Sequence, residues 1–464
     1  MEAALMIPSL MVSLIYSQGD TAAFLIAIGI TALCGALLAL LFKPKRQDLN
    51  ARDGLAVAGM SWAVLSFFGA LPFCLSGAIP NFADAYFEAV SGFTTTGATI
   101  LSDIEALPKG ILFWRSFTHW IGGTGVLVFT LALLPKLSGR TAHLARAESP
   151  GPTFTKLLPK MGDTAKVLYL LYFALSGIMM IILVFAGMNL YDALIHTFGT
   201  AGTGGFSNYN ASVGAFDSPL IEWIIAFFMM FFGINFAMYF HLLRRDMKPI
   251  LRNEELWTYL SLVTVCTLGI TVAIYPRYGF AEGLRHAFFH VASIISTTGF
   301  ASADFDLWPV CVRTVIVVLM FVGACAGSTA GGFKVSRIVL LAKSAIREIQ
   351  HTLQPRKVAV VRFEGKAVQE STLGALGIYL FVYILFLIVG TLLLSFETSD
   401  FASAFTACLT CLSNVGPGLG QVGPSQNFSF FSEPLKILLS FIMLAGRLEL
   451  YPMLVLFAPS MWKK

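Results

Sequence analysis

Four short polar segments, each closed by a glycine, recur along the chain. They span residues 94–97, 202–205, 296–299 and 413–416, so that their closing glycines are 108, 94 and 117 residues apart. An alanine stands twelve residues before each closing glycine, and a large apolar residue follows that alanine every time. This pattern indicates an internal repeat, in which a short apolar helix runs four times into a polar turn.

The residue types in these turns suit the binding of a dehydrated cation. Backbone carbonyl oxygens can replace the hydration shell of an ion, and glycine adopts the dihedral angles that turn consecutive carbonyls toward one axis. Uncharged oxygen ligands suit an alkali cation, whereas zinc and copper favour Cys and His. The predicted ion-binding residues, and the only residues at which we expect a metal ion, are Thr95, Thr96, Gly97, Thr203, Gly204, Gly205, Thr297, Thr298, Gly299, Asn414, Val415 and Gly416.

The composition places these turns in a membrane. Hydrophobic residues make up 56% of the chain and charged residues 12%, whereas about a quarter of the residues in a typical soluble domain are charged. A run of 3–17 is expected to be a short span, and because Glu2 and no basic residue precedes it, a cleaved signal peptide is not expected. Longer apolar runs, of a length that can cross a bilayer, lie at 22–42, 55–75, 110–134, 167–188, 219–243, 256–275, 309–344, 373–395 and 433–458.

The basic residues predict the orientation, because short cytoplasmic loops collect Lys and Arg. Loops 43–52, 136–166, 244–252 and 334–366 are rich in these residues, whereas the glycine turns lie between them among more acidic segments. The turns are therefore predicted to lie in the outer half of the membrane. A basic inner face against anionic lipid explains the net charge of +5, so no nucleic acid partner is expected.

The expected fold is an all-α polytopic membrane protein, in which four pseudo-symmetric helix–pore-loop–helix repeats surround a central pore. The short helices cannot span the bilayer, and their irregular turns are tolerable where they line a watery cavity. An N-terminal two-helix prefix precedes the repeats. The expected divisions are 1–54 for the prefix and its basic loop, 55–166 for repeat 1 and a cytoplasmic loop, 167–255 for repeat 2, 256–372 for repeat 3, and 373–464 for repeat 4.

The span at 309–344 is interrupted by residues 323–332, which include four glycines. Each glycine inside a helix costs about 1 kcal/mol relative to alanine, so a continuous helix is not expected here. Such a break must line water or pack in protein; close helix packing through small residues is the alternative. The segment is not a phosphate-binding loop, because Gly332-Phe333-Lys334 lacks the required ending. Its glycines are Gly323, Gly327, Gly331 and Gly332.

Arg447 lies deep within the last predicted span. A charge at that depth is costly unless it faces a cavity or a partner, and snorkelling to the surface is the alternative. Glu449 is two residues away and cannot share its helix face, so Glu449 is expected to pair elsewhere. We predict that Arg447 and the loop 323–332 together form a barrier, or gate, in the pore.

These motifs together resemble the Trk/Ktr/HKT superfamily of potassium transporters, and within it the membrane subunits of bacterial Trk systems. The resemblance covers essentially the whole chain. It rests on TTTGAT (94–99), GGTGVLVF (122–129), TAGTGGFSNY (200–209), STTGFAS (296–302), GSTAGGFK (327–334), SNVGPG (413–418) and GRLELYP (446–452).

The resemblance implies potassium uptake across the bacterial inner membrane through one pore per subunit of a homodimer. It implies K+ as the transported ion, with Rb+ and more weakly Na+ also accepted, no cofactor, and a cytoplasmic nucleotide-binding regulatory subunit, TrkA. It also implies that the loop 323–332 obstructs the pore beneath the filter and that Arg447 projects into it. No turn reads TVGYG, so we expect fewer ion sites and moderate discrimination against sodium.

Two alternatives remain open at this point. An enzyme is not expected, because the sequence has no HExxH, GxSxG or Walker pattern. A proton- or sodium-coupled potassium symporter would need a titratable group in the path, such as Glu222 or a histidine. Asn235 and Glu222 are expected either to line the pore or to bridge helices. Structural hydrogen bonding behind the pore helices is predicted for Arg115, His119, His196 and His290.

Overall fold

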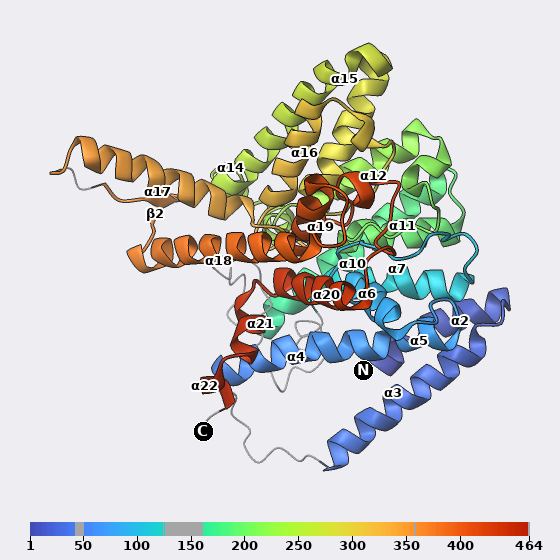
Figure 1. The fold of residues 1–464 in the computed structure, drawn as a ribbon. Helices are drawn as coiled ribbons and strands as arrows, with labels where there is room; N and C mark the ends of the chain where they lie inside the picture. The colour runs from blue at the N-terminus through green and yellow to red at the C-terminus, as the bar shows by residue number, and fades with distance from the viewer. Residues whose placement is uncertain (42–50, 124, 126–160, 357–358, 463–464) are drawn as a thin grey trace.

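The structure is a computed structural model that describes the chain except for residues 42–50, 124, 126–160, 357–358 and 463–464 (Figure 1). Most of the basic loops 43–52 and 136–166 therefore lies outside the described residues. The described part is almost entirely helical, and its one sheet is a hairpin of β1 (Arg362–Phe363) and β2 (Lys366–Ala367).

The same order of elements occurs four times: a long helix, a short helix, an extended turn and a second helix. The prefix before them consists of α1 (Glu2–Leu5), α2 (Ile7–Tyr16) and α3 (Thr21–Leu41). The long helices are α4 (Ala51–Gly69) with α5 (Leu71–Leu75), α10 (Met161–Phe185), the first part of α15 (Glu254–Ile295) and α18 (Glu370–Leu394). The short helices are α6 (Phe82–Phe93), α11 (Leu190–Gly202), the second part of α15, and α19 (Phe401–Ser413).

The helices that follow the turns end near the middle of their predicted spans. They are α7 (Lys109–Gly123), α12 (Pro219–Phe232), α16 (Val310–Val322) and α20 (Glu433–Arg447). Further elements are α13 (Phe236–Leu243), α14 (Met247–Leu251), α17 (Val335–Leu353), α21 (Tyr451–Leu456), α22 (Pro459–Trp462) and short 3-10 turns at Ser212–Phe216, Phe305–Leu307 and Gly420–Val422. Figure 1 shows α17 and α18 extending side by side away from the rest of the molecule.

These breaks correct two of the predicted spans. The interruption of 309–344 is confirmed, because α16 ends at Val322 and α17 begins at Val335. The runs 219–243 and 433–458, however, are not continuous helices. The first bends by 93° between α12 and α13, and the second breaks after Arg447, where the next helix begins at Tyr451. Among the described residues, five helices are therefore long and apolar enough to cross a membrane, or six with the bent pair.

Polar N-caps fix where the short helices begin. The side chains of Asn81, Asn189 and Asp400 accept backbone N–H groups at the starts of α6, α11 and α19, which satisfies donors that a helix start leaves unpaired. The carboxyl of Asp400 also accepts the Ser403 hydroxyl, and this hydrogen bond holds its pKa below the ordinary value. In repeat 3, α15 instead changes direction at Gly279, whose φ is 70°.

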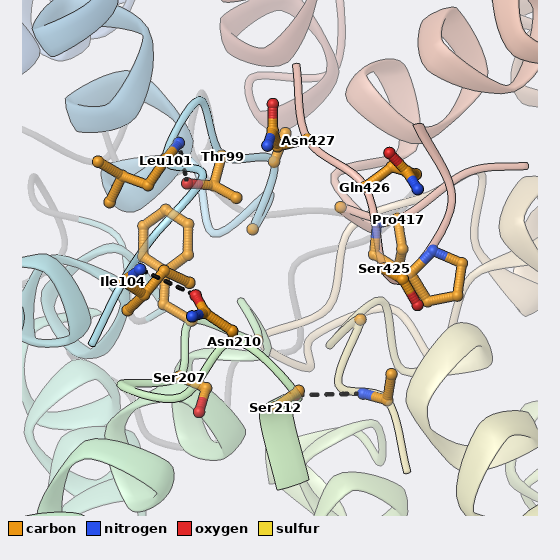
Figure 2. Close-up of a pocket in the computed structure, with 18 of the residues that line it drawn as sticks. Thr99, Leu101, Ile104, Ser207, Asn210, Ser212, Pro417, Ser425, Gln426 and Asn427 are labelled. Carbon is orange, nitrogen blue, oxygen red and sulfur yellow. Dashed lines mark hydrogen bonds between the residues drawn. The ribbon is translucent and has the colours of Figure 1, made fainter. Parts of the chain in front are cut away.

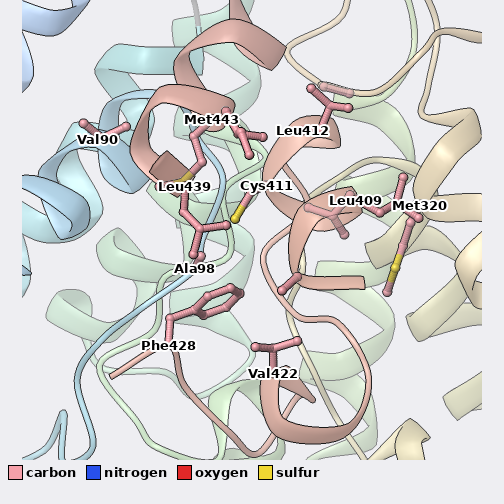
Figure 3. Packing of buried hydrophobic residues seen from close by; sticks show 14 of the residues in the cluster. Val90, Ala98, Met320, Leu409, Cys411, Leu412, Val422, Phe428, Leu439 and Met443 are labelled. Atoms are coloured by element: carbon pink, nitrogen blue, oxygen red, sulfur yellow. The ribbon is translucent and has the colours of Figure 1, made fainter. Parts of the chain in front are cut away.

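The short helices pack into a buried apolar cluster at the centre of the molecule. Figure 3 shows part of it, where Leu439 and Met443 of α20 lie between Val90 of α6 and Cys411 of α19. Cys408 and Cys411 are buried and free, as are the other cysteines in having no disulfide, which agrees with apolar packing. In a membrane, such close packing is a main source of helix association, and here it holds the short helices around one axis.

Candidate functional site

The four glycine turns meet in a closed ring. A Cβ built on Gly97 would lie 2.0 Å from the carbonyl oxygen of Gly204, in the next repeat. The same construction on Gly205 meets the carbonyl oxygen of Thr298 at 2.1 Å, and on Gly299 that of Val415 at 2.1 Å. On Gly416 it meets the carbonyl oxygen of Thr96 at 2.7 Å, which returns to repeat 1. Each turn thus presses a carbonyl against the glycine of its neighbour, and none of these positions has room for a side chain.

The four turns share one backbone conformation. A residue with positive φ follows the end of each short helix, at 55° for Thr95, 56° for Thr203, 57° for Thr297 and 55° for Asn414. Two positions later comes the closing glycine, with φ between 77° and 100°. Between them, the amide N–H of Thr96, Gly204, Thr298 or Val415 donates to a carbonyl five residues earlier, over 2.8–2.9 Å.

Such a turn satisfies the last carbonyls of the helix by a Schellman-type hydrogen bond. It also directs the partly negative helix end toward the ring, which favours a cation there. The structure therefore brings together all twelve residues that the sequence predicts as ion ligands. In repeat 4 the positive-φ residue is Asn414, and its side-chain amide donates to the Thr96 hydroxyl over 2.9 Å.

A polar cavity opens on one face of the ring. All four closing glycines line it, together with the residues that follow them in the chain. Figure 2 shows Thr99, Ser207 and Asn210 on one side of this cavity and Gln426 and Asn427 on another. We call this cavity the vestibule. By the predicted orientation it faces the outside.

Acidic side chains stand just behind the vestibule wall. The side chain of Asn210 donates to Asp103 over 3.2 Å, and that of Ser425 donates to Asp304 over 3.0 Å. Asn210 and Ser425 both line the vestibule. Carboxylates placed around a cleft raise the local cation concentration, so the electrostatics of the vestibule favour cation entry.

The loop 323–332 packs against the opposite face of the ring. The amide N–H of Gly331 donates to the Thr297 hydroxyl over 2.7 Å, and a Cβ on Gly331 would lie 2.4 Å from the carbonyl oxygen of Ser413. The loop also joins the break in repeat 2, where the N–H of Phe236 donates to the carbonyl of Gly327 over 3.0 Å. The predicted barrier loop thus lies directly beneath turns 3 and 4.

Arg447 lies beneath turn 1, at the end of α20. Its guanidinium donates to the Thr95 hydroxyl over 3.1 Å and to the carbonyl of Thr329, in the loop, over 2.8 Å. It also donates to the carbonyls of Gly122 and Gly123 over 2.7 and 3.2 Å. The charge therefore faces protein carbonyls on the axis side and does not snorkel toward the surface. Arg447 and the loop are in direct contact, as the sequence predicts.

Glu449 and Glu222 both pair away from the ring. Glu449 accepts from Arg337 of α17 over 2.5 Å, which confirms that it pairs elsewhere than with Arg447. Glu222 of α12 forms a salt bridge with Arg285 of α15 over 3.1 Å and therefore bridges helices. Asn235 caps α13 by accepting the N–H of Ala237, and a Cβ on Gly327 would lie 2.9 Å from its side-chain oxygen.

The polar residues behind the short helices form the hydrogen bonds that the sequence predicts for them. Arg115 pairs with Glu88, a ring nitrogen of His119 lies 2.7 Å from the carbonyl of Gly92, and His196 contacts Ser207. Sequence reasoning missed the role of Glu88. Its position, nine residues before Gly97, is the one that the histidines of repeats 2 and 3 occupy, and this register is the signal that could have identified it.

Sequence reasoning also missed Glu255, which holds both ends of the loop 323–332. Its Oε1 atom accepts the backbone N–H of Ala326 over 2.8 Å and that of Ser336 over 3.0 Å. Glu255 stands in the first turn of α15, where an acidic residue is unremarkable in sequence because it complements the helix dipole. No sequence pattern indicates its partners, which lie more than seventy residues further along the chain.

These features define a helical membrane protein of the cation-transport class, built around a ring of four turns. A family model described as TrkH, cation transport protein, matches residues 20–274 and 255–464. The chain belongs to this TrkH family, which is a family of transporters and not of enzymes.

Individual relatives match over nearly the whole chain. The Trk system potassium uptake protein TrkH of Halomonas elongata is 37% identical over 99% of this chain and 96% of its own length. That of Escherichia coli K12 is 38% identical with the same coverage. The crystal structure of the potassium transporter TrkH from Vibrio parahaemolyticus superposes with a TM-score of 0.88 at 32% identity, covering 99% of this chain and 96% of that one.

Proposed function

We propose that this protein takes up potassium across the bacterial inner membrane as the pore-forming, multi-pass subunit of a Trk-type system. The closed ring of four glycine turns carries the proposal, because four inward-pressed carbonyl turns offer a dehydrated ion oxygen ligands from every side. The names of the relatives, which are potassium uptake proteins and a potassium transporter, support K+ as the ion. Rb+ and, more weakly, Na+ are expected to follow the same path without any cofactor.

The proposed mechanism is that of a gated channel. A hydrated cation enters the vestibule, loses water to the ring formed by Thr95–Gly97 and its three counterparts, and meets the barrier beneath. The barrier consists of Arg447, whose charge repels a cation on the axis, and the loop 323–332, which occupies the far face of the ring. Conduction requires both to move away from turn 1 and turn 3. The direct contact between Arg447 and Thr329 supports their moving together.

The second candidate, ion-coupled symport, needs a titratable group in the path. Glu222 is the acid that best suited that role in sequence, yet its salt bridge with Arg285 supports a helix-bridging role instead. His196 and His290 contact the segments that follow the turns and stand behind them. These contacts favour the channel over the symporter.

The proposed assembly includes a second copy of the chain and a cytoplasmic regulator. The regulator is expected to be the nucleotide-binding subunit TrkA, docked on the basic face opposite the vestibule. The ion pairs of Arg337 with Glu449 and of Lys343 with Glu254 tie α17, which follows the barrier loop, to α20 and α15. A force applied to α17 would therefore reach the barrier directly.

Purified protein in a planar bilayer under a potassium gradient tests the function. We expect the current to reverse near the potassium equilibrium potential and to be unaffected by an added pH gradient. A reversal potential that follows the proton gradient would instead establish coupled transport. A current that does not distinguish potassium from chloride would overturn the proposal altogether.

Replacing Glu255 with glutamine should increase opening in the absence of the regulator. A hydrogen bond to a charged acceptor contributes about 1.5–3 kcal/mol, so weakening the bonds to Ala326 and Ser336 should favour the open state by about tenfold. Single-channel open probability is the measurement. The matched control is Glu254→Gln, which removes the neighbouring ion pair with Lys343 and leaves the loop contacts intact. Equal open probabilities in the two variants would contradict the role of Glu255.

A further inference from the structure

The position nine residues before the closing glycine ties each short helix to the segment that leaves the ring. Its occupants in repeats 1, 2 and 3 are Glu88, His196 and His290. His196 contacts the Ser207 hydroxyl at 3.1 Å, and His290 accepts the N–H of Ala303 over 3.2 Å. In repeat 4 the position is an alanine, and the neighbouring Thr406 takes over by accepting the N–H of Leu419 over 2.9 Å. All four exit segments are thus anchored from behind.

Repeat 1 uses a fully buried carboxylate for this contact. Glu88 accepts the Thr99 hydroxyl at 2.9 and 3.1 Å and the backbone N–H of Ile100 at 3.1 Å. Thr99 lies two residues after Gly97 and lines the vestibule. A carboxylate that receives several donors at fixed distances constrains the backbone more tightly than a single neutral hydrogen bond, because bonds to charged groups are about twice as strong.

Arg115 extends this contact into the next repeat. Its Nε donates to Glu88 over 2.6 Å, while Nη1 donates to the carbonyl of Ser207 over 2.9 Å. The guanidinium also stacks on the ring of Phe206, 3.5 Å from its centroid. Phe206 and Ser207 directly follow Gly205, so one buried ion pair holds the exits of turns 1 and 2 at once. In the other repeats an imidazole or a hydroxyl occupies the equivalent place.

We propose that the Glu88–Arg115 ion pair is a positioning device that sets the geometry of turns 1 and 2 and thereby the ion selectivity of the ring. The inference rests on the proposed function of the ring as a filter. Neither side chain is a ligand of the ion. The pair acts through the carbonyls next to Gly97 and Gly205, which touch across the ring, and Glu88 also neutralises a guanidinium that would otherwise repel cations in the vestibule.

The test compares the K+/Na+ permeability ratio of Glu88→Gln with that of wild type, from reversal potentials with K+ on one side of a bilayer and Na+ on the other. Glutamine keeps the size of the side chain but removes the charge that holds Arg115. We expect the ratio to fall at least threefold and the potassium conductance to fall with it. Thr99→Val, which removes one donor to Glu88 and leaves the ion pair in place, should shift the ratio in the same direction by less.

The matched control is Asp84→Asn on the same helix. Asp84 pairs with Lys436 of α20 over 2.6 Å, away from the ring, so its loss tests the effect of breaking an ion pair of α6 as such. Asp84→Asn should lower thermal stability and leave the permeability ratio unchanged. A wild-type ratio in both Glu88→Gln and Thr99→Val would reduce the pair to a structural role.

The inference and the proposed function can fail separately. If wild type itself does not distinguish K+ from Na+ or conducts no cations, the filter proposal fails. If wild type is selective and Glu88→Gln is equally selective, only the inference fails. If Glu88→Gln does not fold, Thr99→Val still decides, because that substitution leaves the buried charges paired.

Discussion

Replacing Arg447 with alanine should raise the potassium flux of the protein without its regulator by at least tenfold. Two unit charges 4 Å apart repel by about 4 kcal/mol at the effective dielectric constant near a protein surface, and each 1.4 kcal/mol changes a rate by about tenfold. The substitution also removes the hydrogen bonds that join the barrier to Thr95 and Thr329. Uptake of Rb+ into proteoliposomes is the measurement.

The control for this prediction is Lys436→Met, on the same helix as Arg447. Lys436 pairs with Asp84 over 2.6 Å and does not contact the barrier loop or the turns through that pair, so its loss should leave the flux near that of wild type. A flux in Arg447→Ala equal to that of wild type would show that the charge does not limit conduction. A glutamine at 447 should give an intermediate flux, because it keeps one hydrogen bond donor without the charge.

The ring could be predicted from sequence because its register repeats. Gly97 and its three counterparts stand at one fixed distance from an alanine, and the order of helix, short helix, turn and helix is legible in the apolar runs. Local rules then determine the turn, since a positive φ and a close carbonyl demand glycine. Thus both the fold class and the twelve ring residues followed from pattern, and the structure brings those residues together.

The breaks after the turns could be predicted only in repeat 3. There, four glycines within ten residues make a continuous helix too costly. In repeats 2 and 4 a single Gly233 or Gly446 is compatible with an apolar helix, and hydropathy does not distinguish one span from two half-helices. What breaks these helices is tertiary: the carbonyl of Gly233 accepts the N–H of Cys325 over 3.1 Å, and a Cβ on Gly446 would lie 2.1 Å from the carbonyl oxygen of Leu412.

The partners of buried charges were the other limit. Glu88, Glu255 and Arg337 each contact residues far away in the chain, and neither composition nor periodicity encodes such pairings. Their positions carried only weak signals, such as the shared register of Glu88 with two histidines. Sequence could therefore locate the ring and the barrier, whereas the side chains that hold them in place required the structure.

Replacing Gly205 with serine should abolish the discrimination between K+ and Na+. Gly205 has a φ of 77°, where residues with a Cβ are strained, and its Cβ would lie 2.1 Å from the carbonyl oxygen of Thr298. A contact that short forces the two turns apart, so that at least one carbonyl leaves the ring. Forcing extra atoms into a packed site typically costs about 1–3 kcal/mol, which is enough to lower a permeability ratio by about tenfold or more.

Reversal potentials with K+ and Na+ on opposite sides of a bilayer measure this effect. The matched control is Gly177→Ser in α10, where a Cβ would have nothing within 4 Å, so the same chemical change should leave selectivity intact. Retention of wild-type selectivity by Gly205→Ser would mean that the ring tolerates expansion and that ions are selected elsewhere. Because Gly205 presses on turn 3 and Gly97 on turn 2, Gly97→Ser should give the same loss from the neighbouring contact, as a ring whose members act together requires.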